Sequence, residues 1–222
     1  MKRFFRLYEW LGPLLLTPLA ALLWWQASGG NAKAVAVALA VPIVHAYVVP
    51  GIGTNLLKVW AFDSRIRIGN FRIQHGFLFG SATASLTATL FLAARPLRLE
   101  GPVAAALATA GLLTLVNWWY DALAIGQGIL RVYNQPWADG AGPVAIAGDY
   151  VLWFFGAFGL LYGGGMALLL DGLPAGAPAS EAARWFAALL GATLLVPTAL
   201  YILASRLRHG HSGCHPVARR PA

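Results

Sequence analysis

The sequence predicts an all-α integral membrane protein, a bundle of about six transmembrane helices with both termini in the cytoplasm. Three observations predict this fold class: 59% of the 222 residues are hydrophobic, only 11% are charged, and the apolar residues form long blocks. Soluble domains carry about 25% charged residues. A block of about 20 apolar residues crosses the hydrocarbon layer as a helix, which satisfies its own backbone hydrogen bonds there.

Six apolar blocks divide the chain. They cover roughly residues 10–25, 34–50, 76–94, 102–120, 150–170 and 185–204. We therefore treat residues 1–204 as one transmembrane domain. Residues 205–222 are basic and contain Gly and Pro, which predicts a disordered cytoplasmic tail. A secretory signal peptide is an alternative for the first block, because Lys2, Arg3 and Arg6 precede it, and cleavage would leave five spans.

The distribution of Lys and Arg predicts the orientation. With a cytoplasmic N-terminus, four of the 16 Lys and Arg residues lie in outer segments: Lys33, Arg95, Arg98 and Arg184. The remaining twelve lie on the inner side, as the positive-inside rule requires. We expect the chain in a bacterial cytoplasmic (inner) membrane. The net charge of +8 does not indicate nucleic-acid binding, because the basic residues are scattered between apolar blocks.

The second and third blocks each carry a histidine near the inner face. His45 lies about a turn and a half from the inner end of its block, and His75 opens the next one. Two histidines on different helices near one membrane face can ligate haem or a metal. His45 and His75 are therefore candidate cofactor-binding residues, with a hydrogen-bonded packing role as the alternative.

The inner segment between these blocks, residues 51–75, is rich in bases. Arg65-Ile66-Arg67-Ile68 alternates, which predicts a short extended piece or a strip on the membrane surface, and Arg72 follows. Together with nearby aromatic residues, Arg65, Arg67 and Arg72 are candidates for binding an anionic head group. Positive-inside topology alone would also produce such a loop.

The fourth block ends in a polar cluster. Asn117, Tyr120 and Asp121 are three and four residues apart, so they share one helix face. A carboxylate at a helix C-terminus is disfavoured by the helix dipole, so Asp121 needs another explanation. The expected substrate-binding set therefore includes Asn117 and Tyr120.

Asp149 begins the fifth block and continues a stripe with Gly156 and Gly163, which predicts that it points into the bundle. Helix capping is the alternative. Asp121 and Asp149 would form a metal-holding or acid–base pair, with His75 as proton carrier; a divalent metal is the cofactor that this pair implies. Asn134, in a polar turn of the second long inner segment, is expected at the rim of the same site.

Two further patterns are weaker. Leu57-Lys58-Val59-Trp60 resembles Leu130-Arg131-Val132-Tyr133, as in an internal repeat of two hairpins. The tail holds metal-ligand types: His209, His211, Cys214 and His215. A tail without a supporting shell orients such ligands poorly. The single cysteine excludes an intrachain disulfide.

The layout of the inner segments resembles that of the membrane cytidylyltransferases that make CDP-activated lipids. That family has a basic, glycine-containing loop entering a helix, then an aspartate at a helix end, a basic segment and a second aspartate. The run 65–70 before Gly76, with Asp121, Arg131 and Asp149, would take these places. The loop lacks the family's Lys-Thr-Trp-Arg-Gly run, so the resemblance implies a lipid-linked substrate by layout only.

These observations lead to a first hypothesis, an enzyme acting on a lipid or isoprenoid substrate with an anionic head group. The alternatives are a non-catalytic subunit or assembly factor of a membrane complex, a haem- or quinone-binding subunit, and a small transporter. The expected partners are membrane lipids, with a second copy of the chain or another membrane protein, and no nucleic acid.

Overall fold

The computed structural model describes residues 2–97 and 101–219. Within these residues, six helical segments are long and apolar enough to cross a membrane. They are α1 (Lys2–Ala27), α2 (Ala32–Gly51), α3 (His75–Leu97), α4 (Pro102–Gly126), a broken segment over Pro143–Gly172, and α8 (Ala179–His209). The prediction of a helical bundle with six such segments is confirmed. Arg98 and residues 220–222, which were part of the orientation and tail predictions, lie outside the described residues.

Two of the segments contain a π-helical turn. In the broken segment, α6 (Pro143–Gly148) is followed by η2 (Leu152–Gly156) and α7 (Ala157–Gly172). The second segment continues from α2 into η1 (Ile52–Leu56). A π-turn holds one extra residue per turn and is frequent at functional sites, because it displaces the side chains around it.

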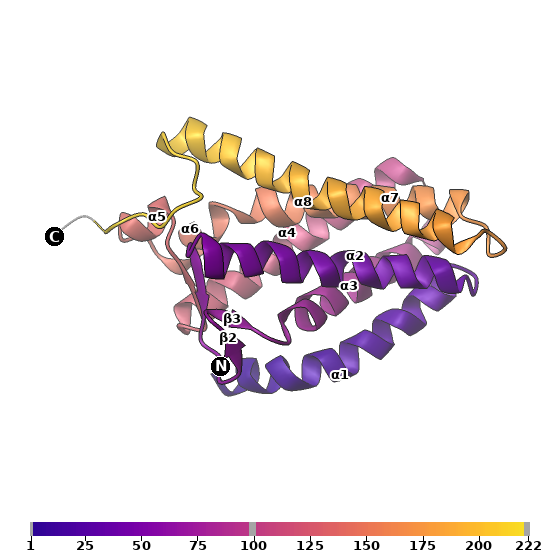
Figure 1. Cartoon of the computed structure of the whole chain (residues 1–222), viewed down its shortest axis with the longest axis horizontal. Coiled ribbons are helices and arrows are strands. Elements are labelled where there is room, and N and C mark those ends of the chain that lie inside the picture. Colours follow the sequence, from indigo (N-terminus) through magenta and orange to yellow (C-terminus); the bar gives the residue numbers. More distant parts are fainter. Residues whose placement is uncertain (1, 98–100, 220–222) are drawn as a thin grey trace.

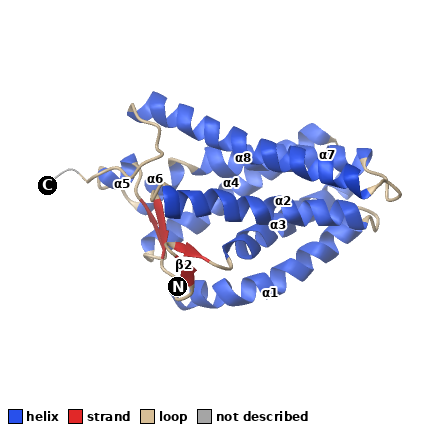
Figure 2. Ribbon diagram, in the orientation of Figure 1, coloured by secondary structure: helices blue, strands red, loops and turns tan. Residues whose placement is uncertain are grey.

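The strands gather at one end of the bundle. In the described part of the chain, these strands are β1 (Trp60–Phe62), β2 (Arg67–Ile68), β3 (Phe71–Arg72) and β4 (Leu130–Val132). Figure 1 shows both chain ends at this end of the molecule, whereas the α1–α2 and α7–α8 connections lie at the opposite end. Figure 2 shows the strands, in red, confined to the same end. We call this end the polar end.

The two long connections are joined to each other. β1 and β4 pair antiparallel, with Trp60 opposite Val132 and Phe62 opposite Leu130. The paired strands overlap the two segments of the suspected repeat, although pairing alone does not establish a duplication. β2 and β3 form a separate hairpin, and its turn contains Gly69 at φ +62°. Part of the alternating Arg65–Ile68 run is thus extended, as predicted.

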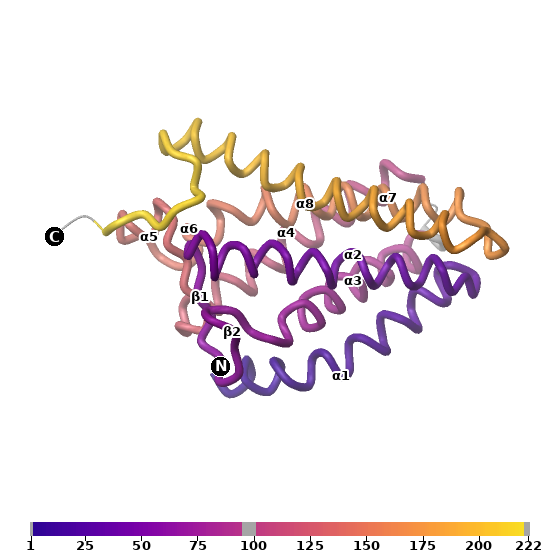
Figure 3. Tube along the Cα trace, viewed as in Figure 1, coloured from indigo at the N-terminus to yellow at the C-terminus, as the bar shows by residue number. Residues whose placement is uncertain are grey.

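Small residues set the helix packing. α7 packs on α4, and a side chain at Gly159 or Gly163 would collide with the α4 backbone. Such stripes allow close helix approach. α1 packs on α3, α3 on α2, and α2 on α8, an arrangement that the Cα trace of Figure 3 follows. Trp24 belongs to this core: it is fully buried and its Nε1 donates to the Ala84 carbonyl at 3.0 Å.

The end of the chain is packed against the polar end. α8 continues to His209, beyond the predicted block. The Val217 amide donates to the Tyr133 carbonyl at 2.9 Å, and the Arg219 guanidinium lies 4.8 Å from the centre of the Trp137 ring. Within residues 205–219, the predicted disordered tail therefore forms the last turn of α8 and an irregular segment with specific contacts. Composition identifies a polar segment but not the surface that receives it.

Candidate functional site

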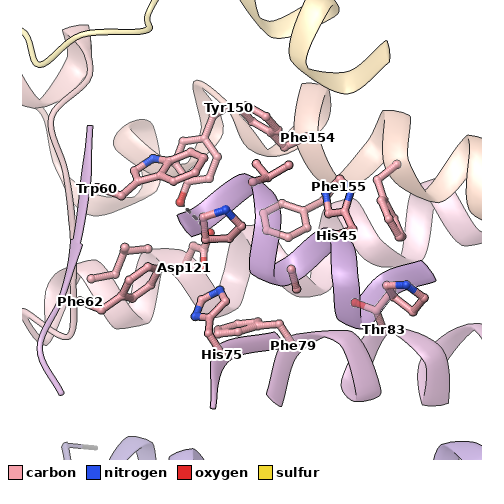
Figure 4. Close-up of a pocket in the computed structure, with 16 residues that line it drawn as sticks. His45, Trp60, Phe62, His75, Phe79, Thr83, Asp121, Tyr150, Phe154 and Phe155 are labelled. Carbon is pink, nitrogen blue, oxygen red and sulfur yellow. Dashed lines mark hydrogen bonds between the residues drawn. The ribbon is translucent and has the colours of Figure 1, made fainter. Parts of the chain in front are cut away.

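An aromatic cavity lies at the polar end (Figure 4). Its volume is about 90 Å³, and it is lined from α2, β1, α3, α4, β4, η2 and α7. The aromatic lining consists of Trp60, Phe62, Phe79, Phe154, Phe155 and Phe158. The polar lining consists of His45, His75, Thr83, Asp121 and Tyr150. An apolar pocket with a few convergent polar groups is the usual form of a small-molecule site.

Asp121 and Tyr150 form a hydrogen-bonded pair in this cavity. The Tyr150 hydroxyl donates to Asp121 Oδ2 at 2.6 Å, and the two residues are 4% and 5% exposed, respectively. Figure 4 shows the two side chains pointing toward each other, with a dashed line for this hydrogen bond. A hydrogen bond to a carboxylate is stronger than a neutral one. Tyr150 precedes η2, and Phe154 and Phe155 in that π-turn extend the same wall.

His75, the first residue of α3, is surrounded by three aromatic rings. Its ring centre is 4.7 Å from that of Phe62, 5.1 Å from Phe71 and 4.4 Å from Phe79. The His45 ring packs against Phe158 at 4.6 Å. Nδ1 of both histidines is buried and has no hydrogen-bond partner within the described residues. Buried polar atoms in native proteins are normally paired, so these two nitrogens call for a functional explanation.

Arg72 is buried beside the cavity. It is 1% exposed, and its guanidinium carbon lies 4.5 Å from the centre of the Phe62 ring and 5.8 Å from that of Phe79. Phe62 and Phe79 also flank the His75 ring, so Arg72 and His75 share these two aromatic neighbours, and Asp121 lies within electrostatic range of Arg72. Nε and Nη2 have no hydrogen-bond partner in the part of the chain described here. A buried cation with free N–H groups is costly unless an anion neutralises it.

The other predicted head-group residues are placed differently. Arg65 and Arg67 are exposed, on or next to the β2–β3 hairpin. Tyr120 packs edge-on against Phe79 at 5.4 Å, but it does not line the cavity. Asn117 is buried and donates to the Leu113 carbonyl of its own helix at 2.8 Å. The cavity thus includes Asp121 from the predicted polar face, with Tyr120 behind it.

Asp149 belongs to a second cluster. Its Oδ1 accepts from Arg208 Nη1 and His209 Nε2, each at 2.8 Å. Asn134 Nδ2 donates to its Oδ2 at 3.1 Å, and Arg208 Nη2 donates to its backbone carbonyl at 2.8 Å. Asp149 is buried, as the glycine stripe predicted, but it contacts α8 and does not line the cavity. The structure does not bring Asp121 and Asp149 together as a pair.

Sequence reasoning missed Glu9. This carboxylate lies in α1, is 5% exposed, and accepts hydrogen bonds from the Ser64 hydroxyl and from Gln74 Nε2 at 2.6 Å. The signal was available, because an acidic residue inside or next to an apolar block is itself a functional hypothesis. The contacts with Ser64 and Gln74 were not predictable from local sequence.

A metal site needs several ligand side chains gathered in one place. Among the described residues, no group of three or more His, Cys, Asp or Glu side chains could hold one. In the tail, the Gly213 amide donates to His211 Nδ1 at 3.1 Å, and His211 Nε2 therefore donates to Gln135 Oε1 at 3.2 Å. Both nitrogens of His211 are thus occupied. Burial and the neighbouring His215 and His209 lower the pKa of His211 below its ordinary value, which favours the neutral ring.

Comparison with known proteins finds no matching family model, no similar curated protein and no similar solved structure. The cytidylyltransferase resemblance thus rests on the layout of the inner segments. In that layout, Asp121 and Asp149 stand for the two family aspartates. Here they have different partners, Tyr150 and the α8 bases.

Proposed function

We propose that this chain is a membrane enzyme that acts on a lipid or isoprenoid molecule with an anionic head group. The head group binds at the aromatic cavity of the polar end, and the hydrocarbon part extends from it toward the apolar surface of the bundle. The cavity combines aromatic lining with a small set of polar groups, His45, His75, Asp121 and Tyr150. This composition suits an amphiphile better than a soluble polar metabolite.

The buried Arg72 carries the proposal. Its guanidinium is next to the cavity, and two of its nitrogen atoms lack partners among the described residues. An anionic head group would neutralise this charge and accept its free N–H groups, as phosphates and carboxylates commonly do with Arg. Asp121 and His75 lie within its electrostatic reach, so acid–base groups and the anion site occupy one place.

The chemistry that these groups supply is proton transfer. His75 has an unpaired ring nitrogen facing an apolar environment, and Asp121 has a single side-chain donor, Tyr150, in the described structure. A carboxylate, a phenol and an imidazole in one mainly apolar cavity can hold or deliver a proton to a bound substrate. We infer the roles of acid–base pair for Asp121 with His75, and of positioning residue for Tyr150.

The test compares two arginines of the same connection. The wild type, Arg72→Gln and Arg65→Gln are purified in mild detergent and examined by native mass spectrometry with lipid extraction. We expect an anionic amphiphile on the wild type and on Arg65→Gln, because Arg65 is exposed. Arg72→Gln should lose it. Equal retention by both variants, or a wild type without an amphiphile, would contradict the proposal.

A second variant guards against misfolding. Asp121→Asn keeps the shape of the side chain and can still accept the Tyr150 hydrogen bond, so the fold should persist. Cells that carry Asp121→Asn should accumulate the unprocessed lipid, as measured by comparing whole-cell lipid profiles. A profile identical to that of wild-type cells, with the protein present at normal level, argues against catalysis.

A haem- or quinone-binding subunit is the second candidate, favoured by one observation. His45 and His75 line the same cavity, and both have an unpaired Nδ1 within the described chain. The cavity of about 90 Å³ is below the usual range of cofactor pockets, about 300–1,000 Å³, which favours a smaller head group. Visible absorbance of the purified protein, with and without haem supplementation, tests the haem version.

We also infer that the polar end faces the cytoplasm of a bacterial inner membrane. The segments assigned to the inner side, with twelve of the 16 Lys and Arg residues, include both ends of the chain and both long connections. The positive-inside rule supports this orientation. Reporter fusions at each connection test it, and an externally active reporter at residues 127–142 would reverse it.

A further inference from the structure

A second cavity lies beside the first. Its volume is about 310 Å³, and residues of α2, η1, β1, β4, η2, α8 and the final segment line it. The α2 and α8 helices pack against each other, so this cavity opens along their junction. On the α8 side, Leu195 lines it and is 71% exposed, which places the opening at the apolar surface of the bundle.

The two cavities share a wall. Val49, Trp60 and Phe154 line both of them. The Trp60 ring lies against Gly53, where an added Cβ would come within 2.4 Å of it, and packs edge-on against Phe154 with the ring centres 5.6 Å apart. Trp60 is fixed in the β1–β4 ribbon through its pairing with Val132. Trp60 thus forms the wall between the aromatic cavity and the second cavity together with Val49 and Phe154.

We propose that the second cavity binds the hydrocarbon chain of the amphiphile whose head group occupies the first. The inference rests on the proposed function, and it adds the substrate class: a single linear chain attached to a small anionic head. The chain enters sideways from the bilayer between α2 and α8. Trp60 lies at the junction between chain and head.

The chemistry of the lining supports a chain and not a second polar ligand. None of the described lining residues is Lys, Arg, Asp or Glu. Two of the polar side chains in the lining are already paired: Thr198 Oγ1 donates to the Leu194 carbonyl at 2.8 Å, and Asn134 Nδ2 donates to the Ile146 carbonyl and to Asp149. The surface that remains is apolar, and each buried CH₂ of a ligand contributes about 0.8 kcal/mol.

A cysteine of the protein can report whether this cavity is occupied. Cys214, the single cysteine, lines the second cavity and is partly exposed. The probe is 1-palmitoyl lysophosphatidic acid, with glycerol 3-phosphate as the same head without a chain. The rate at which N-ethylmaleimide alkylates Cys214 is measured in detergent by mass spectrometry. At about ten times its Kd, the palmitoyl probe should slow alkylation about tenfold, whereas the head alone should not.

Two variants of α8 form the matched comparison. Thr198→Trp fills the cavity and should abolish the protection of Cys214 by the probe. Ala199→Trp adds the same side chain one position along, where the residue is exposed and does not line the cavity, and it should retain protection. Val48→Phe narrows the cavity from α2 and repeats the test if Thr198→Trp does not fold. Unfolding temperature is recorded for each.

The outcomes separate the two proposals. Loss of protection in Thr198→Trp but not in Ala199→Trp supports the chain cavity. Binding of the palmitoyl probe that requires Arg72 but leaves the alkylation rate of Cys214 unchanged overturns the chain cavity and retains the proposed function. Protection of Cys214 that is equal in Thr198→Trp, Val48→Phe and the wild type also overturns it. No binding of any anionic amphiphile overturns the proposed function itself.

Discussion

Asp121 and Asp149 lie at the same end of the bundle and are equally buried, yet their surroundings differ. Asp149 has two basic partners from α8 and an amide from Asn134. Within the described residues, Asp121 accepts one side-chain hydrogen bond, from Tyr150, lines a cavity and lies within electrostatic range of Arg72. Asp149 therefore has the contacts of a residue that holds the fold together. Asp121 has the contacts of a residue available to a ligand.

The two aspartates illustrate two roles that a buried charged residue can have, a structural one and a functional one. A charge that is fully paired contributes to the packing of its own elements, in this case the end of α6 against the end of α8. A charge with few partners is costly and persists where a function needs it. Four variants or conditions test this difference, beginning with the largest effect on stability.

Replacing Asp149 by Ala removes the acceptor of Arg208 and His209. Charge-assisted hydrogen bonds are worth about 1.5–3 kcal/mol each, and Arg208 is partly exposed, so we expect a loss of about 3 kcal/mol in unfolding free energy. Unfolding in detergent measures it. Asp139→Ala is the control, since Asp139 is exposed and its carboxylate accepts a hydrogen bond from the neutral side chain of Gln135. An equal loss of unfolding free energy in both variants would contradict a structural role for Asp149.

Asn134→Ala tests the uncharged partner of Asp149 in the same cluster. The Asn134 amide donates to Asp149 and to the Ile146 carbonyl, and its oxygen caps α5 (Gln135–Ala138) by accepting from Trp137. Loss of a cap and of buried hydrogen bonds predicts a decrease of about 2 kcal/mol. The double variant with Asp149→Ala should be less destabilised than the sum, because the two residues share a contact. Strict additivity would show that they act independently.

Asp121→Asn should have the opposite effect to Asp149→Ala, with little change in stability and a clear change in lipid binding or processing. The amide oxygen can still accept from Tyr150, and a buried charge is removed, so the unfolding free energy should change by less than about 1 kcal/mol. Retention of the anionic amphiphile or the cellular lipid profile should nevertheless change. A large loss of stability with unchanged lipid binding would place Asp121 in the same class as Asp149.

The smallest expected effect is that of acid on the final segment. The pKa of His211 is lowered in the folded chain by burial and by His215 and His209, against a smaller opposing contribution from Asp149. Its contribution to stability is therefore complete above the unfolded pKa, near 6.5, and is lost as the pH falls below it. Protonation also removes the acceptor for the Gly213 amide.

Hydrogen exchange of residues 211–219 measures this effect at pH 7.5 and 5.5, after correction for the intrinsic rate. Exchange should be faster at the lower pH in the wild type. His211→Gln should show a smaller difference between the two values. Identical protection at both values in the wild type would exclude a contribution from His211.

Much of the bundle was predictable, because hydrophobic blocks and glycine stripes are local patterns. The long apolar runs predicted six helices, and Gly156 and Gly163 predicted a close helix contact. The irregular parts depend on contacts between distant residues: the last segment is held by Tyr133 and Trp137, whose positions follow from the fold of another connection. The burial of Trp24 likewise depends on a distant residue, since its Nε1 donates to the Ala84 carbonyl on α3.

For the candidate site, residue type was more informative than spacing. Asp121, His45 and His75 were selected because ionisable groups are rare in or next to apolar blocks, and Arg72 was selected as one base of a basic connection; all four lie at or beside one cavity. The sequence could not separate Arg72 from Arg65 and Arg67, since the hairpin that buries one and exposes the others depends on Gly69 and Asn70. Nor could it pair Asp149 with bases sixty residues away.

The β1–β4 ribbon has a mechanical consequence. It ties the connection that carries Arg72 to the connection that receives the final segment, and Trp60 lies within it. Hydrogen-bonded strands tend to move together. A displacement of the final segment would therefore pass through Tyr133 and β4 to Trp60, which lines both cavities. A partner that pulled on the exposed C-terminal side of the molecule would thereby change access to a site inside the bundle.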